Sequence, residues 1–149
     1  MKSAAARARI LASALLLGSG VALAVADDAA RSAHPDWEPG VEAIRAKEWT
    51  VAIAHFTAVV RNEPDNADAH NWLAYAYRNG RDLERAFEHY RIALRIDPQH
   101  RGAHEYIGEA YLAAGNKAKA REHLAILEKL CGKGCEEYRD LARAIAAAR

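Results

Sequence analysis

The sequence is poor in side chains that act as nucleophiles or as soft metal ligands. It has two cysteines, and its single methionine is the first residue. Beyond residue 26 it has one serine, Ser32, and two threonines, Thr50 and Thr57. A serine nucleophile needs a positioned base beside it, and no phosphate-binding loop of the G-x-x-x-x-G-K-[ST] type occurs. We therefore expect a protein that is not an enzyme and that uses no cofactor.

Clustered positive charge, which nucleic-acid recognition requires, is also missing. The basic residues Lys2, Arg7 and Arg9 instead precede an apolar run over residues 10–26 that ends in an A-x-A pattern. This order is typical of a secretory signal peptide cleaved after Ala26. The run is short and broken by glycine, which argues against a membrane anchor. We expect an exported protein, and the Ala-rich chain best suits a bacterial periplasm.

Cleavage at that site would leave residues 27–149, which suits one small domain. Without its first three basic residues the chain has 18 basic and 20 acidic residues, a net charge of −2. No apolar run after residue 26 is long enough to cross a bilayer. We expect no nucleic-acid partner and no stable membrane insertion after cleavage.

The remaining chain has helical apolar patterns and a longer period of 34 residues. The blocks 33–66, 67–100 and 101–134 can be aligned without gaps. They share small residues at positions 8 and 20, large ones at position 24, and in two blocks tyrosine at 11 and proline at 32. These are Gly40, Ala74 and Gly108; Ala52, Ala86 and Ala120; Phe56, Tyr90 and Leu124; Tyr77 and Tyr111; and Pro64 and Pro98.

This pattern resembles the tetratricopeptide repeat. The resemblance implies an all-α fold, a right-handed solenoid of three helical hairpins. The segment "CEEYRDLARAIAAAR" would add a C-terminal capping helix. Residues 27–35 are predicted to form a flexible leader, and 36–149 the repeat domain with its cap. Helices are predicted near 39–47, 49–62, 67–79, 83–96, 101–114, 117–130 and 135–147.

Two local features refine the prediction. Gly80 and Gly115 stand where the first helix of a hairpin must end, which indicates C-caps. The first block has Pro39 at position 7 and Ala43 at position 11, so its first helix is expected to start late and to pack less.

The seven histidines raise the question of a metal site. Most of them follow the repeat: one set shares position 23 and a second set shares position 4. These are His55, His89 and His123, and His70 and His104. Equivalent residues on neighbouring hairpins lie roughly 10 Å apart, whereas zinc ligands lie about 2 Å from the metal. A periodic row therefore does not by itself make a site.

The remaining metal candidate comprises His100, His104 and Glu105, with Glu109 one turn further on. His104 and Glu105 are adjacent on a predicted helix and point in different directions. We expect surface and packing histidines and no metal site.

Cys131 and Cys135 stand in "CGKGC", between the third hairpin and the capping helix. In an exported chain, two close cysteines most simply form a disulfide, which would fasten the cap. Two other interpretations stay open: copper(I) binding by the two thiolates and disulfide exchange. A metal- or redox-handling protein is therefore the alternative function.

The resemblance implies a partner, because tetratricopeptide arrays bind peptides or proteins in a concave groove lined by the first helix of each hairpin. Carrying the family's groove positions onto this chain gives ten candidate residues. They are Asp68, Asn71, Trp72, Tyr75, Arg78, Asn79, Glu105, Tyr106, Glu109 and Leu112.

Some family members grip a chaperone's C-terminal carboxylate with lysine and asparagine at set groove positions. Here Asn71 fits, but Tyr75 stands at position 9, and Glu105 and Glu109 bring negative charge. We expect no such clamp. A third interpretation is a structural subunit whose groove is filled by a second copy, so self-association stays open.

Overall fold

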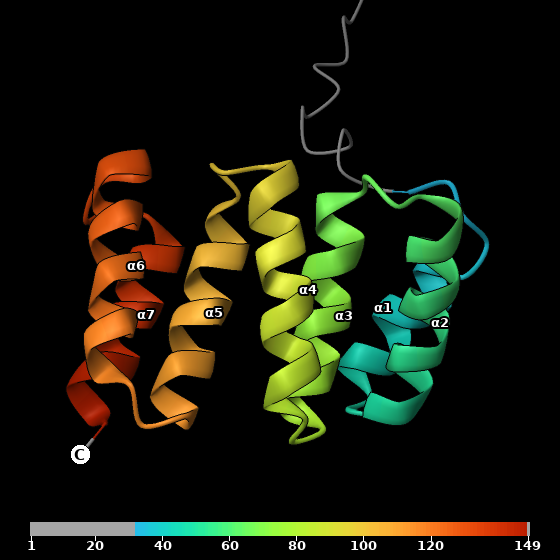
Figure 1. Cartoon of the computed structure of the whole chain (residues 1–149), viewed down its shortest axis with the longest axis horizontal. Coiled ribbons are helices and arrows are strands. Elements are labelled where there is room, and N and C mark those ends of the chain that lie inside the picture. The colour runs from blue at the N-terminus through green and yellow to red at the C-terminus, as the bar shows by residue number, and fades with distance from the viewer. Residues whose placement is uncertain (1–31, 149) are drawn as a thin grey trace, which may run out of the picture.

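The computed structural model describes residues 32–148. The predicted signal peptide, and residues 27–31 of the predicted leader, lie outside this range. The described chain consists of seven α-helices without a strand, which confirms the all-α class (Figure 1). They are α1 (Trp37–Arg45), α2 (Trp49–Asn62), α3 (Ala67–Asn79), α4 (Leu83–Ile96), α5 (Arg101–Ala113), α6 (Lys117–Cys131) and α7 (Glu136–Ala147).

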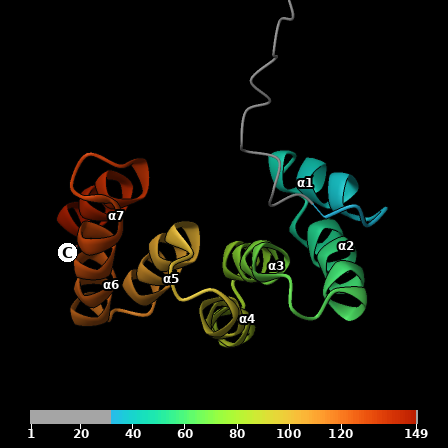
Figure 2. The same cartoon turned by 90° about the horizontal axis from the view of Figure 1, so that it is seen from above.

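The helices form three antiparallel hairpins, α1–α2, α3–α4 and α5–α6, and α7 packs against both α5 and α6. Figure 2 shows that the array curves: α1, α3, α5 and α7 follow its inner side, and α2, α4 and α6 its outer side. The first helix of every hairpin and the capping helix therefore share the concave face.

Small residues at positions 8 and 20 let neighbouring helices approach closely. Ala52, Ala86 and Ala120 at position 20 are all fully buried. At position 8, a Cβ on Gly108 would lie 2.6 Å from Cδ2 of Leu141, which is shorter than any normal contact. The glycine thus lets α7 rest directly on the backbone of α5.

The first helix of each hairpin ends in the same turn, with a left-handed residue at position 15. These residues are Lys47 (φ 59°), Arg81 (φ 69°) and Gly115 (φ 76°). The next amide donates to the carbonyl five residues earlier, as from Asp82 to Tyr77 at 2.9 Å, which is a Schellman motif. Gly80 is the C-cap of α3, as predicted, although its φ is −75° and the left-handed residue is the next one, Arg81. In α5 the C-cap is Ala114, and the predicted Gly115 follows it as the left-handed residue.

The late start predicted for the first helix is confirmed. Helix α1 begins at Trp37, position 5 of its block, whereas α3 and α5 begin at position 1. Pro39 stands in the first turn of α1, where a missing amide proton breaks no helical hydrogen bond. Trp37 is 4% exposed and packs edge-on against Phe56, with ring centroids 5.6 Å apart. A tryptophan at position 5 thus supplies the bulk that Ala43 lacks at position 11.

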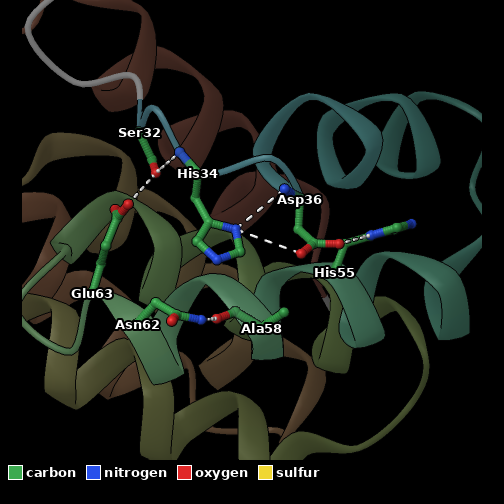
Figure 3. Close-up of polar contacts among 7 residues, drawn as sticks. All are labelled: Ser32, His34, Asp36, His55, Ala58, Asn62 and Glu63. Carbon is green, nitrogen blue, oxygen red and sulfur yellow. Dashed lines mark hydrogen bonds and ion pairs between the residues drawn. The ribbon is translucent and has the colours of Figure 1, made fainter.

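The last residues of the predicted leader contact the first hairpin (Figure 3). The Ser32 hydroxyl donates to Glu63 at 2.6 Å and accepts the backbone amide of His34 at 2.9 Å. The His34 ring faces Asp36, with Nδ1 3.5 Å from the carboxylate. Ser32 is therefore engaged by a carboxylate and a backbone amide, and the His34 imidazole is directed away from it.

Cys131 and Cys135 form a disulfide, as predicted, with their Cα atoms 5.8 Å apart. Helix α6 ends at Cys131, Gly132 takes a left-handed conformation (φ 75°), and Cys135 is the N-cap of α7. The bridge thus joins the end of one helix to the start of the next.

Replacing Arg81 by glycine is expected to stabilise the protein. A side chain in the left-handed region costs about 1 kcal/mol that glycine does not, so Arg81→Gly should raise the free energy of unfolding by about 0.5–1 kcal/mol. Urea denaturation measures the change. Arg81→Ala is the control, because it keeps the strained backbone, and an equal gain in that variant would contradict the explanation.

Removing the disulfide is expected to destabilise the protein by about 2 kcal/mol, the loop-closure entropy of so short a ring. The variant is Cys131→Ser with Cys135→Ser, and urea denaturation of the oxidised protein is the reference. The reduced wild type should match the double variant. Unchanged stability in both would mean that the bridge does not fasten α7.

Candidate functional site

Four aromatic side chains form a row across the first two hairpins and α5. Tyr75 lies at its centre, with ring centroids 6.1 Å from Trp49, 5.7 Å from Trp72 and 4.9 Å from Tyr106. Trp72 also stacks on the buried Phe56 at 6.4 Å. Trp72, Tyr75 and Tyr106 are half-buried, so each ring packs between hairpins and keeps part of its surface in solvent. We call Trp49, Trp72, Tyr75 and Tyr106 the aromatic row.

An ion pair crosses the same face. The Arg78 guanidinium on α3 binds the Glu109 carboxylate on α5, and the two side chains are only 15% and 26% exposed. The guanidinium carbon also lies 5.2 Å from the Tyr75 ring centre and 5.8 Å from that of Tyr106. Charge pairing and cation–π contact thus hold one arginine in a single orientation.

Two further predicted residues lie deeper. Asn71 is 4% exposed, and its Oδ1 atom is buried without a hydrogen-bond partner among the described residues. Glu105 is 9% exposed. Burial, and after it the carboxylates of Glu109, Asp140 and Glu137, together raise the pKa of Glu105 to about 8. At neutral pH Glu105 is therefore mostly protonated.

The other predicted residues lie at the margins. Asp68 pairs with His100, with Oδ1 and Nε2 3.0 Å apart. The Asn79 side-chain amide donates to the Tyr75 carbonyl at 2.8 Å, which caps local backbone. Leu112 packs against the smaller core cluster, which contains Leu141 and Ile145 of α7, and so belongs to a different cluster from the aromatic row.

Three residues of this face were missed from the sequence. Trp49 stands at position 17 on α2, outside the family positions carried over. Glu137 and Asp140 belong to α7, which has no register in the 34-residue period; their spacing of three residues does place both on one helical face.

The histidines pair within hairpins, because antiparallel packing brings position 4 of the first helix against position 23 of the second. His70 Nδ1 lies 3.0 Å from His89 Nδ1, and His104 Nδ1 lies 2.9 Å from His123 Nδ1. In the first hairpin an aspartate takes position 4, and Asp36 lies 2.7 Å from His55 (Figure 3). Comparing the same repeat position in different hairpins could not predict this pairing, because it joins two different positions of one hairpin.

The contacts of each pair define its protonation. His104 Nε2 lies 3.0 Å from the Pro98 carbonyl, which only accepts, so this nitrogen carries the proton and Nδ1 accepts from His123. Burial lowers the pKa of His104, and burial together with the charge of His104 lowers the pKa of His123 to about 4. Burial likewise lowers the pKa of His70 and of His89.

The candidate metal group around His100 is not assembled. Both ring nitrogens of His104 are engaged as described, and His100 Nδ1 accepts the Ala103 amide at 3.2 Å. Within residues 32–148, the one group of three metal-capable side chains close together is Cys131, Cys135 and Glu137, and both of its sulfurs are in the disulfide.

Two family models, both described as tetratricopeptide repeat, match residues 40–101 and 103–131, together more than half of the chain. The chain belongs to the tetratricopeptide repeat family. No curated protein matches it. None of the described helices has the length and apolar character that crossing a membrane requires.

Solved tetratricopeptide structures share the fold. Residues 41 to the end of MamA from Desulfovibrio magneticus RS-1 align at 25% identity and a TM-score of 0.61, over 64% of this chain and 54% of that one. This chain thus spans about half of the MamA chain. The TPR2B domain of yeast Sti1, in a complex with pHsp70, aligns at 19% identity and 0.70, over 76% and 92%. The first repeat domain of Spaghetti (RPAP3), bound to the HSP90 peptide SRMEEVD, aligns at 19% and 0.64, over 74% and 92%.

The histidine pairs predict an acid-sensitive stability. Each histidine of the two His–His pairs has a folded pKa below its unfolded value near 6.5. Between about pH 6.5 and 4 the unfolded chain therefore binds more protons, and the free energy of unfolding falls as the pH falls. Between pH 7 and pH 5, the free energy of unfolding of the double variant His89→Gln with His123→Gln should fall by about 1–2 kcal/mol less than that of the wild type.

Urea denaturation at the two pH values measures this difference. Glu88→Gln, an exposed change beside His89, is the matched control and should retain the full pH dependence. Equal pH dependence in the wild type and the double variant would refute the role given to the pairs.

Proposed function

We propose that the protein is a non-enzymatic adaptor of the cell envelope that binds a protein or peptide segment on its concave face. The observation that carries the proposal is the aromatic row with the Arg78–Glu109 ion pair beside it. Rigid aromatic anchors beside a few oriented polar groups commonly dominate protein binding.

The arrangement favours an extended apolar and polar segment. Tyr75 and Tyr106 keep an exposed part while the remainder of each ring is held by its neighbours, so binding would cost little side-chain entropy. Arg78 is already neutralised by Glu109, which leaves the centre of the face without a free anion-binding group. We therefore expect the centre of the concave face to select the side chains of a partner by their shape and not by their charge.

The solved relatives support a peptide ligand for this chain, but the charge of its concave face favours a peptide that is less acidic than the HSP90 peptide. The Sti1 domain is seen with pHsp70 and the RPAP3 domain with SRMEEVD, a peptide with three acidic residues. In this chain Glu137 and Asp140 of α7 stand at one end of the same face, and their negative charge would disfavour an acidic segment. The inferred ligand therefore differs in charge from that peptide.

Export to a bacterial periplasm is part of the proposal. It is supported by the signal-peptide pattern before residue 27 and by the disulfide, since such bonds persist in oxidising compartments. The alternative, a metal- or redox-handling protein, needs Cys131 and Cys135 as thiols. Thiol counting on the purified protein distinguishes the two: no free thiol supports the adaptor, and two free thiols with bound copper support the alternative.

A photo-crosslinking amino acid in place of Tyr75 is expected to capture one dominant protein, identified by mass spectrometry. The same amino acid at Glu88, on the convex helix α4, should not capture it. With that partner in hand, Tyr75→Ala should weaken binding by about tenfold or more, as expected for an aromatic anchor. Capture of nothing at Tyr75 would contradict the proposal, and capture of a second copy would favour the structural-subunit interpretation.

A further inference from the structure

A hollow of about 250 Å³ opens between α5 and α7, next to the aromatic row. Its lining combines one glycine, one tyrosine and four carboxyl groups. The residues are Gly102, Glu105, Tyr106, Glu136, Glu137 and Asp140. It is smaller than the roughly 300–1,000 Å³ typical of small-molecule pockets, and its size suits a single side chain.

The hollow carries an excess of negative charge. Two of its carboxylates have arginine partners at the rim: Glu137 lies 3.5 Å from Arg101, and Asp140 lies 2.6 Å from Arg143. Those arginines are 53% and 76% exposed, so water screens both pairs. The nearest buried cation, Arg78 on α3, is already bound to Glu109. No described cation therefore neutralises the interior of the hollow.

Glu105 is the unusual member of this lining. It is more than nine-tenths buried, and it makes neither a hydrogen bond nor an ion pair with any residue from 32 to 148. Its carboxyl oxygens are not among the polar atoms that are shut off from solvent without a partner, and Glu105 lines the hollow, so a ligand in the hollow can reach them. Behind Gly102, the Asn71 Oδ1 atom is buried without a partner among the described residues, and Asn71 Nδ2 lies 3.6 Å from the place of a Gly102 Cβ.

We propose that this hollow receives a lysine or arginine side chain of the bound partner, with Glu105 as its central acceptor. The proposal rests on the proposed function, because the hollow continues the same concave face. It names the chemistry of the partner: a segment with a basic residue beside apolar ones.

The geometry favours a basic side chain over a metal ion. The ligand atoms of these four carboxyl groups do not gather within 4.8 Å of one another, as a metal site would require. Carboxyl oxygens that lie apart from one another can instead accept hydrogen bonds from the five N–H groups of a guanidinium or the three of an ammonium group. Tyr106 lines the same hollow, and an aromatic ring attracts a cation that comes to lie over it.

Binding of a cation should release a proton. The free protein keeps Glu105 largely protonated at neutral pH, under the combined effect of burial and of Glu109, Glu137 and Asp140, against the opposing charge of Arg78. A bound cation favours the carboxylate. Affinity should therefore rise by up to about tenfold from pH 6.5 to 8 and then level off.

The test uses N-acetyl-arginine methylamide as the probe and the citrulline analogue, which has the same shape without the charge, as its control. NMR titration of the 15N-labelled chain follows the amides of Gly102, Tyr106 and Asp140. Saturable shifts with the arginine probe, at least about tenfold weaker for citrulline, are expected. Equal shifts with both probes, or no shift at these amides, would overturn the proposal.

Three variants sharpen the titration. Glu105→Gln should weaken binding of the probe by about tenfold and abolish its pH dependence. Asp140→Asn, at a half-buried position, should weaken binding by about two- to threefold while keeping that dependence. Glu88→Gln removes the same charge from the convex face and should change nothing. An unaltered pH dependence in Glu105→Gln would overturn the role of that residue.

The arginine titration and the crosslinking experiment at Tyr75 can give different results, so the two proposals can fail independently. Partner capture at Tyr75 without arginine binding would retain the adaptor and reject the basic-residue hollow. Arginine binding without partner capture would support the hollow and reject a partner on the aromatic row. Self-association of the chain that the arginine probe reverses would assign the hollow to a second copy and overturn the proposal of a separate partner.

Discussion

The contact of Leu141 with the backbone of Gly108 places the last helix on the concave face. A side chain at position 8 of the third repeat would occupy the space of the Leu141 methyl groups. Because α7 lies this close to α5, its carboxylates at Glu137 and Asp140 contribute to the field around Glu105. The charge of the concave surface at this end therefore depends on a steric condition at one glycine.

The concave face combines two kinds of chemistry. Its centre is aromatic and electrically balanced, with Arg78 bound by Glu109 and flanked by Tyr75 and Tyr106. Its C-terminal end is acidic, with Glu105, which has no partner among residues 32–148, at its base. A ligand that satisfied both parts would present apolar side chains to the row and a positive charge to the end. Charge complementarity of this kind fixes the direction in which a segment binds.

Buried titratable groups act on stability with opposite signs. The paired histidines have lowered pKa values, so they disfavour the folded state as the pH falls below about 6.5. Glu105 has a raised pKa near 8, so the folded state binds the extra proton and loses stability as the pH rises toward that value. A cation bound beside Glu105 would offset the second effect, which links occupancy of the face to stability.

The sequence by itself determined the hairpins, their helix boundaries to within two residues, and the close packing at positions 8 and 20, because local patterning and a 34-residue period encode them. Tertiary structure decided what the period does not contain. Antiparallel packing paired positions 4 and 23, so His70 meets His89; the left-handed turn fell on Arg81 beside Gly80; and α7, outside the repeat, brought Asp140 to Glu105. These results depend on distances between helices, which a linear pattern does not specify.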